Sequence, residues 1–217
     1  MKPLNKVKIR WSPKFAYAIG LIATDGNLSK DGRHISFTSK DKQLAEIFVK
    51  TLAIKNKIGR KASGTVKEKR YFNIQFGDVN FYSFLQKIGL TVNKSKTLGA
   101  IKIPNKYFFD FLRGSFDGDG CFYSYWDPRW KSSFMFYTEF ISASLEHVLW
   151  LQKEIKTHLG ISGHISRGGS SICYQLRYAK KESIKLLAKI YYKKNLPTLE
   201  RKRVKAYNAL VVDRKSK

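Results

Sequence analysis

The stretch "AYAIGLIATDGNL" (residues 16–28) decides the fold, because a similar stretch, "FDFLRGSFDGDGCF" (residues 109–122), occurs again later in the chain. Each stretch is largely apolar, is predicted to be helical and ends at an Asp-Gly step, and the two aspartates lie 94 residues apart (119 − 25). Each also has a glycine six residues before the glycine of the step, namely Gly20 and Gly114. Small residues let helices approach backbone to backbone, so we expect these two helices to pack along their length.

The elements that follow each stretch repeat in the same order. Apolar spacing predicts helix, hairpin, helix, hairpin, helix over residues 12–89, and the same series begins again after a basic connector. Equivalent positions lie 103 residues apart at Ser39 and Ser142 (142 − 39) and 102 apart at Gln75 and Arg177 (177 − 75). The first hairpin of the second copy is therefore about nine residues longer than that of the first (103 − 94).

A repeat of about 100 residues is too long for a solenoid and indicates two pseudo-symmetric halves. We predict an α+β fold with an N-terminal half at 1–90, a basic connector at 91–104 and a C-terminal half at 105–217. A basic helix near 199–210 closes the second half. Two related halves suit a partner with two-fold backbone symmetry, as duplex DNA has.

The charge of the chain is its strongest compositional signal. There are 42 Lys and Arg against 16 Asp and Glu, which gives a formal net charge of +26. Such a charge attracts polyanions and costs self-repulsion in the free protein, so nucleic acid is the leading candidate for a partner. An anionic membrane surface and a ribosomal type of structural protein are the alternatives.

Hydropathy and cysteine usage indicate an intracellular, reducing compartment, either a prokaryotic cytoplasm or an organelle. No run approaches the ~20 apolar residues of a spanning helix, and the N-terminus "MKPLNKVKIRW" lacks an apolar signal core. The two cysteines, Cys121 and Cys173, have no Cys or His neighbour at zinc-ligand spacing and are expected to be free thiols. We expect no membrane partner.

The two Asp-Gly steps point to a metal site. One such step is explained better as a helix terminator followed by a turn. Two copies change this, because an acid at the C-terminal end of a helix lies against the negative end of the helix dipole. Two acids brought together there, Asp25 and Asp119, are costly unless a divalent cation bridges them. Paired carboxylates that hold hard divalent cations are suited to phosphodiester hydrolysis, in which the metal activates water and stabilises the leaving oxygen.

Strand alternation separates the residues that face the helices from those that face outward. In the first half Ile35, Phe37, Phe72, Ile74 and Phe76 are expected to face the helices. Arg, Gln and Asn side chains on the outer face can pair with base edges in the major groove, and Lys and Arg can contact phosphates. The candidate DNA-binding residues are Arg33, His34, Ser36, Thr38, Lys61, Lys69, Arg70, Tyr71, Asn73 and Gln75 in the first half, and Tyr125, Arg129, Lys131, Tyr137, Glu139, Arg167, Gln175 and Arg177 in the second.

The two motifs "AIGLIATDG" (18–26) and "LRGSFDGDG" (112–120) resemble those of the LAGLIDADG homing endonucleases of the single-chain, two-motif type. The connector "NKSKTLGAIKIPNKYFFDFLRGSFDGDG" (93–120) is also typical of them. The resemblance implies two αββαββα halves, each with a saddle-shaped four-stranded antiparallel sheet over DNA. It also implies a monomer that cleaves both strands across the minor groove of a long asymmetric target. The cofactor would be Mg²⁺, with Mn²⁺ or Ca²⁺ able to substitute in binding.

The resemblance also assigns roles to residues. It makes Asp25 and Asp119 the metal ligands, assisted by the backbone carbonyls of Thr24 and Gly118. The family often has a polar residue that orients water at the end of the second strand, and a lysine near the start of the terminal helix that polarises this water. Those positions fall on Ser39 and Ser142, and on Lys94 (or Lys96) and Lys202. The first motif has Ala23 where the second has Asp117, and we interpret Asp117 as helix-end polarity.

A second class of function remains open on the same scaffold. An RNA maturase or a DNA-binding regulator would use the basic surface without cleavage. Both acids being present favours the nuclease, because a binding protein does not need two juxtaposed carboxylates. An endonuclease domain carried by an intein is disfavoured, because no splicing-type Cys or Ser junctions flank the domain.

Overall fold

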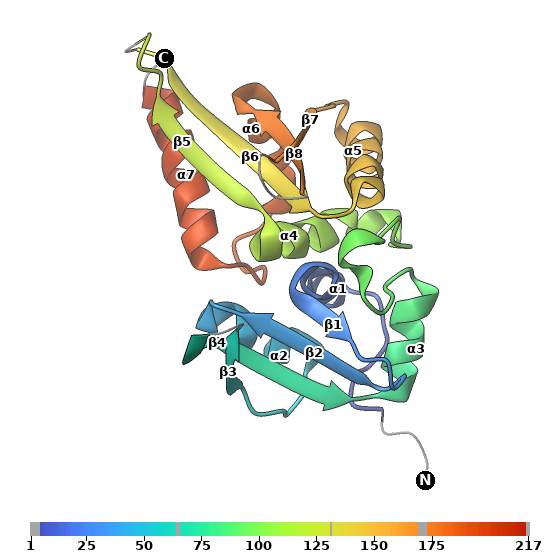
Figure 1. Ribbon diagram of the computed structural model, residues 1–217. Coiled ribbons are helices and arrows are strands. Elements are labelled where there is room, and N and C mark those ends of the chain that lie inside the picture. The colour runs from blue at the N-terminus through green and yellow to red at the C-terminus, as the bar shows by residue number, and fades with distance from the viewer. Residues whose placement is uncertain (1–4, 64–65, 131, 169–172, 216–217) are drawn as a thin grey trace.

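Two four-stranded antiparallel sheets lie one on each side of a central pair of helices (Figure 1). The computed structural model describes residues 5–63, 66–130, 132–168 and 173–215. The strand order is β1-β2-β4-β3 in the first sheet and β5-β6-β8-β7 in the second. The predicted fold, two α+β halves of the same topology, is confirmed.

The first sheet contains β1 (Gly26–Leu28), β2 (His34–Ser39), β3 (Gly59–Ser63) and β4 (Val66–Gly77), and the second β5 (Cys121–Trp126), β6 (Phe134–Ser142), β7 (His164–Arg167) and β8 (Tyr174–Ala179). The helices of the first half are α1 (Pro13–Asp25), α2 (Lys42–Leu52) and α3 (Val79–Lys87). Those of the second half are α4 (Phe108–Asp119), α5 (Leu145–Leu159), α6 (Lys180–Ile190) and α7 (Glu200–Lys215). Helix α7 thus runs past the predicted end near residue 210.

Helix α1 begins where the sequence predicts a helix start. The Ser12 side chain accepts a hydrogen bond from the Phe15 amide at 3.1 Å, and Pro13 occupies the first helical position. A serine cap satisfies one of the unpaired amides of the first turn, and proline has no amide to leave unpaired. The helix is buried from Phe15 to Ala23, which places it in the centre of the molecule.

The two glycines hold α1 and α4 in direct backbone contact, as predicted. A Cβ atom added to Gly20 would lie 2.2 Å from the carbonyl oxygen of Phe111, and one added to Gly114 would lie 2.1 Å from that of Tyr17. Each glycine also meets the other, since these Cβ atoms would lie 2.9–3.1 Å from the opposite glycine Cα. No residue larger than glycine fits at either position without moving a backbone.

The sheets keep the predicted faces. Ile35, Phe37, Ile74 and Phe76 are buried against the helices. Phe72 is only half-buried, and its ring is covered by the Arg60 guanidinium at 3.9 Å. Figure 1 shows α2 behind the first sheet and α6 and α7 behind the second, so that one face of each sheet is left open toward the viewer. We call this the open face.

The second half differs from the first mainly in its first hairpin. Strand β5 pairs with β6 along its whole length, from Cys121↔Glu139 to Trp126↔Phe134, whereas β1 pairs only three residues with β2. The insertion predicted from the spacing of the repeat therefore lengthens this hairpin, which projects beyond the rest of the sheet in Figure 1. Neither cysteine forms a disulfide. No helix within the described ranges is long and apolar enough to cross a membrane.

We predict that Gly114→Ala lowers the melting temperature by at least about 6 °C. The added methyl group would collide with backbone atoms, and overpacking of this kind costs about 3 kcal/mol, each kcal/mol being about 2–4 °C for a chain of this size. Thermal unfolding followed by circular dichroism measures the shift. Gly59→Ala is the matched control, because its Cβ would have only an ordinary contact of 3.6 Å with Asn73. Equal losses in the two variants would contradict the assigned contact.

Candidate active site

The C-terminal ends of α1 and α4 meet, and each ends in an aspartate. Gly118 brings the two ends together, because a Cβ at this position would lie 2.1 Å from Thr24 Oγ1 and 3.1 Å from Asp25 Oδ2. Asp25 is half-buried there and Asp119 is the more exposed of the two. The predicted juxtaposition of these two acids is what the fold produces.

The electrostatics of the pair fit two acids that oppose each other. Burial, and after it the carboxylate of Asp119, raises the pKa of Asp25 to about 7, although Lys202 and Lys94 act in the opposite direction. Desolvation also raises the pKa of Asp119 against the same two lysines. The two carboxylates therefore resist being charged together, which is the condition that a bound divalent cation relieves.

Two lysines lie on the backbone carbonyls next to the acids. Lys94 Nζ donates to the carbonyl of Gly26 at 2.6 Å and to that of Thr24 at 3.4 Å. Lys202 Nζ donates to the equivalent carbonyls of Gly120 at 2.6 Å and Gly118 at 3.1 Å, and also to the two carbonyls before Gly118. Both cations thus cover the negative end of a helix dipole and lie beside the acids.

Lys94 and Lys96 differ in burial. Lys94 is 6% exposed and Lys202 is 8% exposed, whereas Lys96 is exposed. Burial lowers the pKa of Lys94 to about 8 and also lowers that of Lys202. The carbonyls of Thr24 and Gly118, which the resemblance assigns to the metal, each have one of these lysines as a hydrogen-bond donor.

Three buried charged residues of α4 hold the segment that leads into α7. Arg113 is fully buried and donates to Asp110 at 2.8 Å and to the carbonyls of Ile190 and Pro197. Asp117 is 1% exposed and accepts from Tyr17 OH and from the Leu199 amide, each at 2.7 Å. These bonds position the first turn of α7 and therefore Lys202.

The interpretation of Asp117 as simple helix-end polarity is therefore incomplete, because its carboxylate is buried between α1 and α7. Burial raises its pKa to about 6 in spite of its hydrogen bonds to Tyr17 and Leu199. The sequence does not reveal that Asp117 is buried, because an aspartate near a helix end looks the same in the sequence whether it is buried or exposed. The equivalent Ala23 of α1 is also buried and has no polar side chain.

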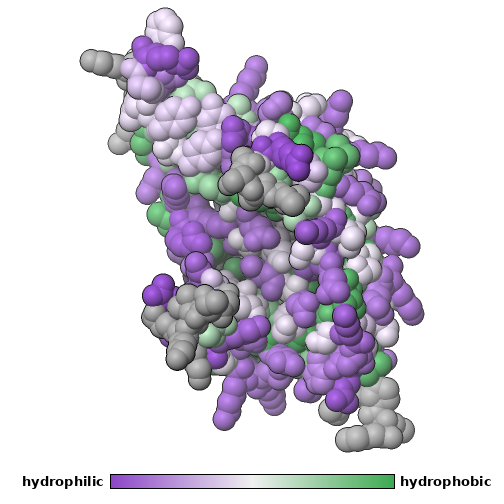
Figure 2. Space-filling model, in the orientation of Figure 1, coloured by the Kyte–Doolittle hydropathy of each residue, from purple (hydrophilic) through white to green (hydrophobic). Residues whose placement is uncertain are grey.

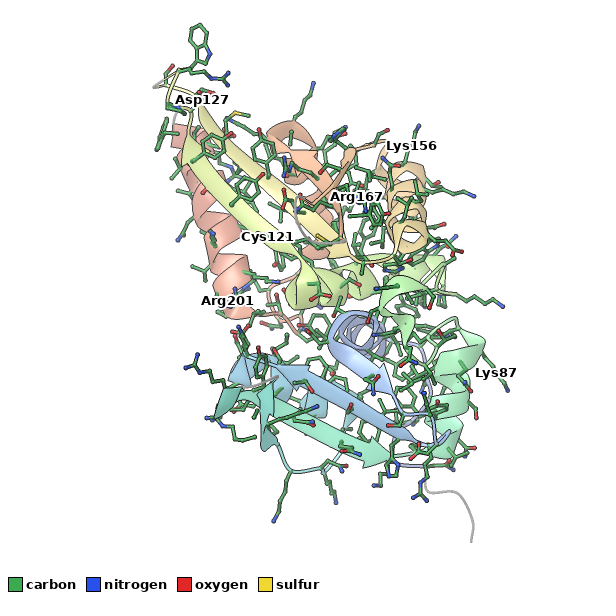
Figure 3. The ribbon with its side chains drawn as sticks, viewed as in Figure 1. Lys87, Cys121, Asp127, Lys156, Arg167 and Arg201 are labelled. Carbon is green, nitrogen blue, oxygen red and sulfur yellow. The ribbon has the colours of Figure 1, made fainter. Side chains whose placement is uncertain are left out.

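An ion pair that the sequence does not predict joins the two halves beside the acids. Arg201, in the first turn of α7, forms a two-pronged ion pair with Asp41 at 2.7 and 3.0 Å. The charge of Asp41 also contributes, as the smallest of the causes, to the raised pKa of Asp25. A second contact joins the halves here, because the Glu200 amide donates to the Gln43 side chain at 3.1 Å. Figure 3 shows Arg201 at the start of α7 on the side of the first half. No signal within one half predicts this pairing across halves.

Ser39 and Ser142 each accept a hydrogen bond in the turn just before a helix. The Asp41 amide donates to Ser39 Oγ at 3.2 Å, and the Ser144 amide donates to Ser142 Oγ at 3.1 Å. Each bond stabilises the turn that enters α2 or α5. Ser39 is 7% exposed, so its hydroxyl group has little contact with solvent.

The open face of the first sheet is polar, as predicted. Ser36, Thr38, Tyr71 and Asn73 are half-buried and Gln75 is exposed on the same face. His34 contacts Asp31 at the tip of the hairpin, and Arg33 lies 3.9 Å from the same acid. Among the candidate DNA-binding residues of the first half whose side chains are described, the exposed ones are Arg33, Lys61, Arg70 and Gln75. Asn27, which sequence analysis overlooked, is exposed beside Ser36 and only two residues from Asp25.

The open face of the second sheet is aromatic. The rings of Tyr123 and Tyr137 stack with centroids 5.2 Å apart, and Tyr125 stacks on Tyr137 at 6.2 Å. Glu139 and Arg177 form an ion pair on this face, and Glu139 is only 5% exposed, so it is not a surface contact as its place in the strand suggests. Gln175 is half-buried and Arg167 is exposed at the end of β7.

The tip of the long hairpin carries a further ion pair. Arg129 has a side chain that is 80% exposed and pairs with Asp127 at 3.0 Å. Lys131 and the side chain of Lys69, both predicted to bind DNA, lie outside the described residues. Figure 2 shows hydrophilic residues of both halves spread over the face seen in Figure 1.

The carboxylates of Asp25 and Asp119 suit a hard cation whose remaining ligands come from water and the substrate. In the described part of the chain, no three His, Cys, Asp or Glu side chains gather as a metal cage. The protein supplies two carboxylates, and Mg²⁺ is commonly held by one or two carboxylates together with water and substrate phosphate oxygens. Asp25 and Asp119 therefore fit such an ion.

Comparison with known proteins agrees with this geometry. A family model described as a LAGLIDADG-like domain matches residues 12–89. The solved structure of I-SmaMI bound to uncleavable DNA is 15% identical with a TM-score of 0.62, and the match covers 97% of this chain and 92% of that one. No curated protein sequence matches the chain.

Two further solved structures share the fold. The I-LtrWI homing endonuclease bound to its target DNA is 14% identical, with a TM-score of 0.60 over 94% of this chain and 91% of that one. The N-terminal LAGLIDADG domain of DUF199/WhiA is 18% identical, with a TM-score of 0.54 over 88% of each chain. The fold thus occurs in homing endonucleases and also in the DUF199/WhiA domain, whose description names no endonuclease.

We predict that Asp25→Asn stabilises the metal-free protein at pH 8 and has little effect below pH 4. The pKa of Asp25 is raised in the folded state, so stability falls as the pH rises from about 4 to about 7, and removing the charge restores it. Melting temperatures measured with EDTA across this range test the sign, and an increase of about 2 °C or more is expected at pH 8.

Asp31→Asn is the control of opposite sign. Hydrogen bonds from His34 and the backbone lower the pKa of Asp31 below its usual value, so this variant should lose stability at pH 8. A loss of stability at pH 8 in Asp25→Asn would contradict the assigned opposition between the two acids.

Proposed function

We propose that this chain, which carries a LAGLIDADG-like domain and has the two-half fold of single-chain LAGLIDADG homing endonucleases, is a site-specific endonuclease of double-stranded DNA. It would act as a monomer, because one chain supplies both halves and both acids. The net charge of +26 and the open faces of the two sheets supply a surface for a duplex.

The meeting of Asp25 and Asp119 at two abutting helix ends is the observation that carries this proposal. Each carboxylate costs free energy in that position, as the raised pKa values indicate. A binding protein gains nothing from this cost, whereas a metal-dependent nuclease needs both acids. Mg²⁺, when bound, would activate water and stabilise the leaving oxygen.

The chain's own residues then have distinct tasks. Asp25 and Asp119 would hold the cation, with the carbonyls of Thr24 and Gly118 beside them. Lys94 and Lys202 keep a positive charge next to the acids, where it opposes the charge of a phosphate and orients water. Arg113 and Asp117 position Lys202 through the first turn of α7.

The residues of the open faces would bind the DNA on either side of the acids. Lys61, Arg70 and Arg167 would contact phosphates, while Asn73, Gln75, Gln175 and Arg177 would read base edges in the major groove. Cleavage would fall across the minor groove between the two sheets. A reducing intracellular compartment and a role in the mobility of an intron follow from this assignment as parts of the proposal.

A DNA-binding protein or RNA maturase without cleavage is the alternative. The likeness to the DUF199/WhiA domain, whose description names no endonuclease, is the observation that favours it. Cleavage of a selected duplex separates the two, because both would bind nucleic acid with a strong salt dependence.

We predict that the protein selects and cuts a duplex from a randomised library in Mg²⁺, and that Asp25→Asn and Asp119→Asn each slow cutting at least 100-fold. That factor corresponds to losing roughly 3 kcal/mol of metal-derived stabilisation of the transition state. Glu46→Gln, at an exposed position of α2 behind the first sheet, is the control and should cut at the wild-type rate. The absence of cutting in both Mg²⁺ and Mn²⁺, with tight binding of RNA, would support the maturase instead.

Lys94 and Lys96, both in the connector, give a second test of the proposed active site. Lys94→Met should slow cleavage of one strand by about 10-fold or more and cause nicked duplex to accumulate, because Lys94 attends only one of the two helix ends. Lys96→Met, two residues away and exposed, should not. Rates are measured at saturating DNA, after binding in Ca²⁺ shows that both variants are folded. Equal rates for the two variants would remove Lys94 from the site.

A further inference from the structure

Arg177 is held from beneath by a buried carboxylate on the open face of the second sheet. Glu139 of β6 and Arg177 of β8 are direct neighbours in the sheet register. The Nε atom of Arg177 donates to Glu139 Oε1, and the Tyr123 hydroxyl donates to the same oxygen at 3.2 Å. The Glu139 side chain is 6% exposed, whereas that of Arg177 is 38% exposed.

Two tyrosine rings confine the same guanidinium from the side. The guanidinium carbon of Arg177 lies 6.0 Å from the centroid of Tyr123 and 5.8 Å from that of Tyr137, within the range of cation–π attraction. The two rings are themselves stacked, with 20° between their planes. Arg177 therefore has little rotamer freedom left to lose when it meets a ligand.

The outer edge of the guanidinium is held only weakly. Its Nη2 atom has one long hydrogen bond to Gln175 at 3.4 Å, while its inner Nε is taken by Glu139. The planar fork of an arginine matches the O6 and N7 acceptors of guanine in the major groove, and this is the commonest specific contact between proteins and DNA. An arginine fixed through Nε on an open face is prepared for such a contact.

We propose that Arg177 selects a single guanine in the part of the target bound by the C-terminal half, and that Glu139 is the residue that positions it. This inference rests on the proposed function, since it requires that the open face binds duplex DNA. Glu139 does not read a base, because its carboxylate is buried and occupied by Arg177 and Tyr123.

The first half has no carboxylate–arginine pair at the equivalent strand positions. There Ser36 pairs with Gln75, as Glu139 pairs with Arg177 in the second half. Gln75 is exposed, and the short Ser36 has no carboxylate to hold it. A glutamine amide matches adenine rather than guanine. The two symmetry-related base pairs of the target are therefore expected to differ, with guanine required only on the side of the C-terminal half.

The competing explanation is that Glu139 and Arg177 form an ion pair that only supports the sheet. The two explanations differ in what a substitution changes. Substituting an ion pair that only supports the sheet would weaken the binding of all DNA sequences equally, whereas substituting an arginine that reads a base would change the base preference at one position.

The test is a binding selection from a randomised duplex library in Ca²⁺, sequenced for the wild type, Arg177→Gln, Glu139→Gln, Arg167→Gln and Gln75→Ala. The wild type should enrich guanine at one position on one side of the centre. Arg177→Gln should reduce that preference by about 10- to 100-fold and leave the other positions unchanged. Glu139→Gln should reduce the ratio of guanine to adenine by a smaller factor while total affinity stays near that of the wild type.

Two controls assign the effect. Arg167→Gln, at the exposed end of β7 in the same sheet, should weaken binding to all sequences alike. Gln75→Ala should change only the symmetry-related position on the other side, which identifies the half that reads the guanine. Melting temperatures show which variants remain folded.

Several outcomes overturn the proposal. Preferences that survive in Arg177→Gln, or a uniform loss over all positions in both Arg177→Gln and Glu139→Gln, would make the pair a support of the sheet. A wild type that binds selected duplexes without a guanine preference on that side would refute the inference and leave the nuclease intact. A wild type that binds no duplex would refute both.

Discussion

The contact between Gly20 and Gly114 is the constraint on which the rest of the structure depends. With no side chain at either position, the backbones of α1 and α4 touch, and a methyl group at either site would lie 2.1–2.2 Å from an opposing carbonyl oxygen. This contact fixes the separation of the helix ends, and so it places Asp25 beside Asp119. It also sets the two sheets on either side of one axis with their open faces turned the same way.

The helix ends show how a charged site is built in an unfavourable position. Two acids lie against the negative ends of two helix dipoles, and burial raises the pKa of both, that of Asp25 also through the charge of Asp119. Lys94 and Lys202 offset this by covering the last carbonyls of each helix, and burial in turn lowers the pKa of both lysines. The buried charges of Arg113 and Asp117 secure the segment that carries Lys202. The site is therefore supported by interactions from both halves.

Much of this arrangement follows from the sequence, because it depends on local signals and on the repeat. The order of elements, the glycine contact, the juxtaposed acids and the long second hairpin were all predictable from spacing and residue type. The roles of Asp117 and Glu139 were not, since a polar residue on a helix or at an outward strand position gives no sign that it is buried by a partner distant in sequence. The pair Arg201–Asp41 likewise joins residues 160 apart that only the packing of the halves brings together.

The two halves are related but not equivalent, and the differences lie where a target would be read. One open face is polar and the other aromatic, with a fixed arginine. The central claim, that the abutting helix ends form one metal site for DNA cleavage, is tested most directly by anomalous scattering from crystals of the DNA complex grown with Mn²⁺. The account predicts an anomalous peak at ligand distance from carboxylate oxygens of both Asp25 and Asp119. Peaks confined to other parts of the complex, or the two carboxylates turned away from each other with no ion between them, would contradict it.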